Sequence, residues 1–176
     1  MGEEAAKTAR RNDNIALIGM PASGKSTVGV ILAKVLAYDF IDTDLLIQKQ
    51  EKRTLASIIE KEGVDSFLRI ENRVCSSIEC SHCVIATGGS AVYGHEAMTH
   101  FRRTGVVIYL KVGYDTLVRR LHNIHSRGVV LREGQSFRDL YEERTKLYEK
   151  YASLVIEEKP GVEDVIVEIV QRLSDY

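Results

Sequence analysis

The sequence of 176 residues has few cysteines, almost no net charge and no long apolar run near its start. Its three cysteines, Cys75, Cys80 and Cys83, are an odd number, which argues against a disulfide framework and for a reducing compartment. A formal net charge of −1 gives no bulk attraction for nucleic acid or for a membrane surface. Binding must therefore come from local sites.

The opening segment, MGEEAAKTARRNDN, lacks the apolar core of a signal peptide or a transmembrane helix. We predict a flexible leader over residues 1–13 of a cytoplasmic protein. The remaining length suits one domain over residues 14–176, and no internal repeat or linker divides it. We expect a monomer with neither a nucleic-acid nor a membrane partner.

Short apolar runs alternate with helical apolar spacing along the whole chain. The runs predict strands at residues 14–18, 40–41, 83–87, 106–110 and 154–156. The helical spacing predicts helices at 25–36, 44–62, 64–78, 96–103, 114–121, 137–151 and 162–173, with Gly63 ending the second of them. This alternation indicates an α/β fold, a three-layer arrangement in which helices flank a five-stranded parallel sheet.

The stretch GMPASGKST follows the first predicted strand and opens the first predicted helix. Glycines there let successive backbone N–H groups face an anion, and the helix adds its positive end. In such a P-loop the lysine reaches the β and γ phosphates of a nucleotide and the following hydroxyl ligates Mg²⁺. The predicted nucleotide-binding residues are Gly19, Ala22, Ser23, Gly24, Lys25, Ser26 and Thr27, with Ser26 also a metal ligand.

Two carboxylates, Asp42 and Asp44, follow the second predicted strand at the edge of the sheet where ligands bind in open α/β folds. Asp42 could hold Mg²⁺ while Asp44 accepts a proton from an attacking hydroxyl. Capping of the following helix is the alternative interpretation, and the two roles are compatible.

Taken in order, the motifs resemble the shikimate kinase family of small P-loop kinases, over about residues 15–173. The P-loop is followed by FIDTD, a Phe-x-x-x-Glu helix segment, ATGG at a strand end, two arginines seven apart and Arg-x-x-Leu-Tyr. The resemblance implies a P-loop kinase fold with a substrate-binding segment at about 43–78. It also implies a mobile lid at about 122–136, where the sequence is polar and basic.

The resemblance also assigns roles to individual residues, with ATP as co-substrate and Mg²⁺ as cofactor. Lys25, Asp44 and Arg127 would be catalytic, because phosphoryl transfer needs positioned charge and a proton acceptor. Arg120 would lie against the adenine, Gly88 and Gly89 would offer backbone N–H groups to the acceptor substrate, and Arg144 would bind its carboxylate. The simpler alternatives are a solvated helix end for Arg120 and Arg127 and a surface ion pair for Arg144.

Two positions depart from the family pattern on the acceptor side. Leu68 stands where the family has a second carboxylate-binding arginine, and the adjacent Arg69 points about 100° away on a helix. Ser90 replaces the third glycine of the glycine run. We therefore predict phosphorylation of a hydroxyl on a small carboxylated metabolite, shikimate first. Gluconate or homoserine as acceptor, or a nucleotide-binding regulator without turnover, are the alternatives.

Overall fold

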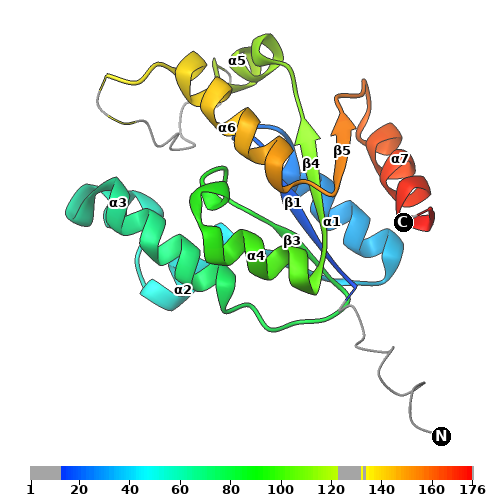
Figure 1. Cartoon of the computed structure of the whole chain (residues 1–176), viewed down its shortest axis with the longest axis horizontal. Coiled ribbons are helices and arrows are strands. Elements are labelled where there is room, and N and C mark those ends of the chain that lie inside the picture. The colour runs from blue at the N-terminus through cyan, green and yellow to red at the C-terminus, as the bar shows by residue number, and fades with distance from the viewer. Residues whose placement is uncertain (1–12, 123–131, 133, 176) are drawn as a thin grey trace, which may run out of the picture.

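The computed structural model describes residues 13–122, 132 and 134–175. Five strands form one parallel sheet in the order β2-β3-β1-β4-β5 (Figure 1). The strands are β1 (Asn14–Ile18), β2 (Asp39–Asp42), β3 (Cys83–Ala86), β4 (Gly105–Lys111) and β5 (Leu154–Glu157). The predicted α/β fold with a five-stranded parallel sheet is confirmed.

Seven α-helices and one short 3₁₀ helix surround the sheet within the described residues. They are α1 (Lys25–Leu36), α2 (Thr43–Glu51), α3 (Leu55–Ser76), η1 (Ala91–Tyr93), α4 (His95–Thr104), α5 (Tyr114–His122), α6 (Phe137–Tyr151) and α7 (Val162–Ser174). None of the helices in this part of the chain is both long and apolar enough to cross a membrane. The predicted lid lies mostly outside the described residues, and so does most of the predicted leader.

The prediction of helices at 44–62 and 64–78 missed a break at residues 52–54, so the first predicted helix is in fact two helices. The first of them, α2, ends at Glu51, and Lys52 after it adopts a left-handed conformation with φ 53°. Thr54 then caps α3, because its side chain accepts a hydrogen bond from a backbone N–H of the first turn. Gly63 has φ 81° and ψ 170°, which are not helical angles, so it divides α3 into two helical segments at the predicted position.

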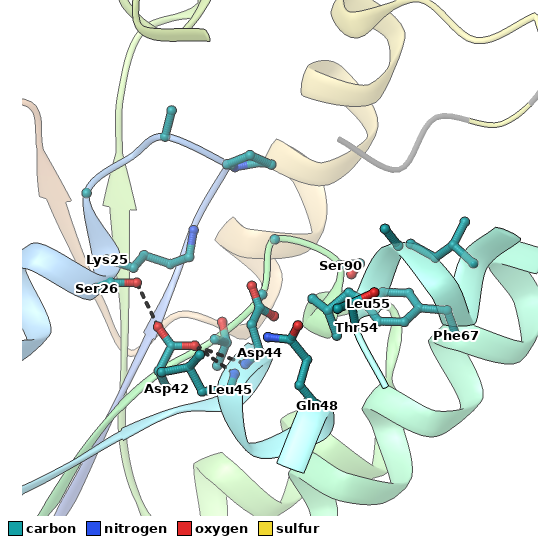
Figure 2. Close-up of a pocket in the computed structure, with 18 of the residues that line it drawn as sticks. Lys25, Ser26, Asp42, Asp44, Leu45, Gln48, Thr54, Leu55, Phe67 and Ser90 are labelled. Carbon is teal, nitrogen blue, oxygen red and sulfur yellow. Dashed lines mark hydrogen bonds between the residues drawn. The ribbon is translucent and has the colours of Figure 1, made fainter. Parts of the chain in front are cut away.

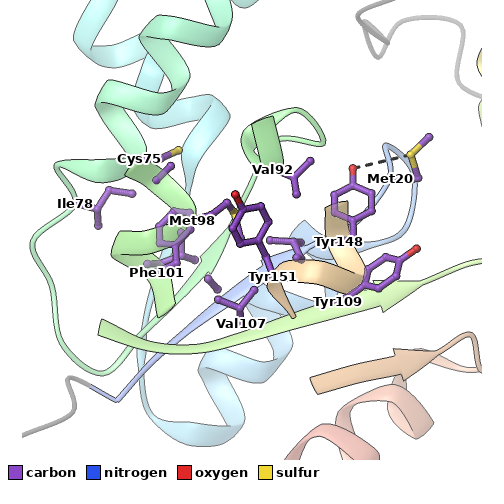
Figure 3. Close-up of a cluster of buried hydrophobic side chains, with 14 of the residues drawn as sticks. Met20, Cys75, Ile78, Val92, Met98, Phe101, Val107, Tyr109, Tyr148 and Tyr151 are labelled. Atoms are coloured by element: carbon purple, nitrogen blue, oxygen red, sulfur yellow. Dashed lines mark hydrogen bonds between the residues drawn. The ribbon is translucent and has the colours of Figure 1, made fainter. Parts of the chain in front are cut away.

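The two faces of the sheet carry separate clusters of buried side chains. Alternation along β1 directs Ile15 and Leu17 to the face covered by α1 and α7, and Ala16 and Ile18 to the opposite face. The cluster on the face of Ala16 and Ile18 is the larger and includes side chains of α4 and α6. In Figure 3 the ring of Tyr148 lies in this cluster beside that of Tyr109. The layers are therefore helix, sheet and helix, as predicted.

A third apolar cluster lies apart from the sheet, between α2 and α3. Its buried members are Ile47, Ile58, Phe67 and Val74. These two helices form an arm that directly follows β2 in the chain, and Figure 1 shows them side by side. The arm has its own small core, so it can present one of its sides to a ligand.

A buried amide side chain joins the start of β1 to the start of β3. Asn14 is 3% exposed; its Nδ2 donates to the carbonyl of Cys80 at 2.9 Å, and its Oδ1 accepts from the N–H of Cys83 at 3.1 Å. We predict that Asn14→Ala lowers the free energy of unfolding by about 2–3 kcal/mol, because two hydrogen bonds are lost in a buried setting. Urea denaturation measures the change.

The matched control is Asp13→Ala, because the Asp13 side chain is exposed and its contact with His82 is 3.8 Å long. This control is expected to change stability by less than about 0.5 kcal/mol. Equal urea midpoints for the two variants would show that the Asn14 bridge contributes nothing.

Candidate active site

The loop between β1 and α1 adopts backbone conformations that favour glycine at two positions. Gly19 has φ 149° and Gly24 has φ 95°. A Cβ atom on Gly19 would lie 2.8 Å from the carbonyl oxygen of Leu110 in β4, so the loop packs directly on the sheet. The glycines of the predicted P-loop are thus required by the backbone.

The ammonium group of Lys25 turns back over this loop. Its Nζ donates to the carbonyl oxygens of Gly19 and Met20, both at 2.8 Å, and the residue is only 7% exposed. The side chain also lines the main cavity. A buried cation at the start of a helix attracts an anion, as phosphate binding requires.

Asp42 connects the P-loop helix with the α2–α3 arm. Its Oδ2 accepts a hydrogen bond from the Ser26 hydroxyl at 2.9 Å (Figure 2). Its Oδ1 accepts from the backbone N–H groups of Asp44 and Leu45, at 3.0 and 3.3 Å, and so caps α2. The capping interpretation of this carboxylate is therefore confirmed, and the second oxygen contacts the predicted metal ligand Ser26.

One cavity of about 550 Å³ collects most of the predicted site residues (Figure 2). The predicted residues that line it are Ala22, Gly24, Lys25, Ser26, Thr27, Asp42, Asp44, Gly88, Gly89, Ser90 and Arg144. The arm adds an apolar wall that sequence reasoning missed, formed by Leu55, Ile59 and Phe67. The cavity therefore has a polar end at the P-loop and a mixed end at the arm.

The two glycines after β3 let charged side chains approach the backbone closely. A Cβ on Gly88 would lie 2.5 Å from Glu71 Oε1 and 2.8 Å from Asp44 Oδ1. A Cβ on Gly89 would lie 3.0 Å from Arg144 Nη1. The amide of Gly88 donates to Thr43 Oγ1 at 3.1 Å, so in this structure that N–H contacts the protein.

Arg144 reaches the cavity from α6 and is only 2% exposed. Its Nε lies 3.4 Å from the Tyr93 hydroxyl, and the guanidinium lies 5.3 Å from the centre of the Tyr93 ring. Among the described residues no carboxylate forms an ion pair with it, so the surface ion pair is absent there. A buried guanidinium that lines a cavity is well suited to binding an anionic ligand.

Sequence reasoning missed Glu71, which lies 1% exposed beneath the glycine turn. Its Oε2 accepts a hydrogen bond from Ser90 Oγ at 2.6 Å, while its Oε1 has no hydrogen-bond partner in the described part of the chain. The signal was present, because Glu71 ends the Phe-x-x-x-Glu segment. Its partner is 19 residues away, however, and only the fold reveals it.

Burial raises the pKa of Glu71 from 4.5 to about 7. The hydrogen bond from Ser90 opposes this rise, as do the positive charges of Arg144 from α6 and Lys25 from α1, while Asp44 from α2 adds to it. Desolvation therefore outweighs the favourable partners, and the carboxyl group titrates near neutral pH.

Leu68 and Arg69 both lie outside the cavity lining. Leu68 packs against the apolar cluster of the arm, and Arg69 is exposed with its Nη2 2.8 Å from Ser66 Oγ. Arg69 therefore does not take the place of the missing family arginine. The apolar wall of the arm stands on that side of the cavity.

Arg120 and Ser23 line a second, smaller cavity of about 40 Å³ beside the P-loop. Arg120 Nη1 donates to the carbonyl of Ala22 at 3.1 Å, and Nη2 pairs with Glu158 at 3.1 Å. The guanidinium is thus anchored against the loop, and it is not simply a solvated helix end. The predicted catalytic Arg127 lies outside the described residues.

The three cysteines are free thiols, and burial raises the pKa of each. For Cys83 the value rises to about 12. Across residues 13–122, 132 and 134–175, no three His, Cys, Asp or Glu side chains gather to hold a metal ion. These thiols are poor nucleophiles at neutral pH.

The P-loop end of the cavity has donors of the type that Mg²⁺ takes. Mg²⁺ binds one or two protein oxygens together with substrate phosphates. The Ser26 hydroxyl and the Asp42 carboxylate supply two such oxygens, 2.9 Å apart, and both residues line the cavity. The donor set therefore fits a nucleotide-bound Mg²⁺.

The family model for shikimate kinase matches residues 21–174. Shikimate kinase 2 of Yersinia enterocolitica is 32% identical over 170 residues, which cover 92% of this chain and 95% of that protein. The shikimate kinase of Aquifex aeolicus is 34% identical over 161 residues, covering 91% of this chain and 95% of its own.

Solved structures agree with the sequence relatives. The shikimate kinase of Acinetobacter baumannii in complex with shikimate superposes with a TM-score of 0.83 at 31% identity, covering 93% of each chain. A gluconokinase from Sinorhizobium meliloti gives a TM-score of 0.61 at 15% identity, over 94% of each chain, so its likeness concerns the fold alone.

The raised pKa of Glu71 makes folding stability depend on pH. Below about pH 4.5 the carboxyl is protonated in both states; between about pH 4.5 and 7 the unfolded state releases this proton while the folded state retains it, so the folded state loses relative stability until the loss levels off above about pH 7. We predict that wild type loses about 3 kcal/mol relative to Glu71→Gln across this range, measured by urea denaturation at a series of pH values.

The control is Glu60→Gln, which changes an exposed glutamate on the same helix. Its stability should follow that of wild type at every pH. Parallel pH curves for wild type and Glu71→Gln would contradict a raised pKa of Glu71 in the folded protein.

Proposed function

The chain belongs to the shikimate kinase family, and on that premise we propose that it transfers the γ-phosphate of ATP to a hydroxyl of shikimate, forming shikimate 3-phosphate for aromatic amino acid biosynthesis. The observation that carries the proposal is the composition of one cavity. It brings the P-loop residues Lys25 and Ser26 together with Asp44 and the buried Arg144.

The donor end suits the triphosphate of ATP. The backbone N–H groups at the start of α1 and the Lys25 ammonium would hold the β and γ phosphates. Mg²⁺, held by Ser26 and Asp42, would neutralise negative charge on those phosphates as the bond to the leaving group breaks. Arg120 would lie against the adenine, a role supported by its anchorage to the P-loop carbonyl of Ala22.

At the acceptor end Asp44 would bind the attacking hydroxyl and take its proton. Asp44 lines the cavity beside Gly88, on the helix that Asp42 caps. A carboxylate within hydrogen-bond reach of the hydroxyl orients it and accepts the proton as the oxygen–phosphorus bond forms. Arg127, from the predicted lid, remains a further proposal for stabilising the transferring phosphoryl group.

Arg144 would bind the carboxylate of the acceptor. Its burial removes competing water, and its planar group can make two parallel hydrogen bonds to a carboxylate. Shikimate carries one carboxylate and three hydroxyls, which match one guanidinium and several polar acceptors in the cavity. Gluconate and homoserine gain no specific support, because the gluconokinase likeness extends to the fold only.

We further propose, as finer points, a reducing cytoplasmic compartment and a monomer. The three free thiols are consistent with the first.

Arg144→Met tests the carboxylate assignment. We predict that KM for shikimate rises about 10- to 100-fold, because a charge-assisted hydrogen bond is lost, while KM for ATP changes less than about twofold. ADP release with and without shikimate measures both. Lys146→Met, an exposed position on the same helix, is the control and should leave KM unchanged. Release of ADP that does not depend on shikimate would overturn the proposed activity.

Leu68→Arg tests whether an arginine at the family position, next to the lining residue Phe67, strengthens acceptor binding. A guanidinium added there could reach the carboxylate that Arg144 binds, so KM for shikimate is expected to fall about tenfold with kcat little changed. Ser76→Arg adds the same charge at the end of α3, eight residues further along this helix, as a control. An unchanged KM in Leu68→Arg would mean that Leu68 has no part in substrate choice.

A further inference from the structure

Ser90 brings a hydroxyl into the cavity at a point where nothing in the fold requires one. It lies between β3 and η1, is 6% exposed and lines the cavity. It precedes η1 as the capping residue, but its side chain makes no capping hydrogen bond. The hydroxyl is therefore not needed for the turn.

The proton of this hydroxyl is directed away from the cavity. Ser90 Oγ lies 2.6 Å from Glu71 Oε2, a short hydrogen bond of the kind that carboxylates accept. Above about pH 7 the Glu71 carboxylate is ionised and can only accept, so Ser90 donates in this contact. The lone pairs of Oγ remain, and Ser90 can offer them to a ligand in the cavity as an acceptor.

Glu71 fixes this direction from behind the cavity wall. It does not line the cavity, and its Oε1 is packed against Gly88, where a Cβ would come within 2.5 Å. The carboxylate has little room to turn, because it is 1% exposed. Glu71 is thus a positioning residue that acts through the Ser90 hydroxyl.

The acceptor end of the cavity then offers two kinds of polar group. Arg144 can only donate, so it selects an anion. Ser90, with its proton given to Glu71, and Asp44 both accept, so each selects a donor such as a hydroxyl. With Asp44 assigned to the hydroxyl that reacts, Ser90 is available for a second one.

We propose that Ser90, oriented by Glu71, accepts a hydrogen bond from a second hydroxyl of the acceptor that does not react, and so selects polyhydroxylated acids over singly hydroxylated ones. The inference rests on the proposed function, because it takes Asp44 as the partner of the reacting hydroxyl. Its new content is a specificity residue at a position where the family pattern has no side chain.

The experiment compares shikimate with 4-deoxyshikimate and 5-deoxyshikimate, each lacking one hydroxyl that does not react. Assays at pH 8.5 keep Glu71 ionised, because its pKa is about 7. We expect wild type to lose about tenfold in kcat/KM with one of the two analogues, as one hydrogen bond is lost. In Ser90→Ala, kcat/KM for shikimate should fall by a similar factor. The kcat/KM of the variant for that analogue should stay within about twofold of the wild-type value.

Glu71→Gln provides the second variant, since an amide can either donate to Ser90 or accept from it. The preference for shikimate over that analogue should fall severalfold, with the loss in KM more than in kcat. Thermal unfolding of each variant shows that it is folded.

The inference would be overturned if wild type had the same kcat/KM for both analogues as for shikimate, or if Ser90→Ala kept the wild-type preference for shikimate. It would also be overturned if Ser90→Ala lost kcat/KM equally with all three substrates, because that result marks a purely structural role. Failure of the proposed function looks different. In that case wild type itself releases no ADP in response to shikimate.

Discussion

The candidate site depends on the close approach of charged side chains to a backbone that has no side chains of its own. At Gly88 the carboxyl groups of Glu71 and Asp44 come within 3 Å of the space a Cβ would fill, and at Gly89 the guanidinium of Arg144 does almost the same. These groups come from three helices, α2, α3 and α6. Any larger residue in this turn would displace Asp44 and Arg144, which line the cavity, and Glu71 behind its wall.

The same turn brings opposite charges into low-dielectric surroundings without pairing them directly. Arg144 and Glu71 are both almost completely buried and attract each other, yet no ion pair joins them among the described residues. Each charge therefore bears part of its desolvation cost, which is visible in the raised pKa of Glu71. An anionic ligand at Arg144 would offset the desolvation cost of the guanidinium. This offset would contribute to the free energy of binding.

Local sequence was enough to predict the donor end, because its chemistry comes from one short segment. One loop supplies the glycines, Lys25 and Ser26. Asp42 comes at the end of β2, the next strand along the chain. The pairing of Ser90 with Glu71 joins residues 19 apart, and sequence pattern cannot show which side chains a turn and a helix bring together. The break between α2 and α3 was missed because Lys52 takes a left-handed conformation that its residue type does not favour, whereas the break at Gly63 was predicted because glycine adopts such conformations readily.

Asp42 has one oxygen on the Ser26 hydroxyl and the other on the N-terminus of the helix that carries Asp44. Removing the side chain would loosen that helix start as well as the donor end, so a loss of turnover in an alanine variant has two causes that a rate alone cannot separate. Asparagine keeps an oxygen for the helix cap and gives up the negative charge. The contrast between the two replacements would divide the rate loss into a part from helix geometry and a part from charge.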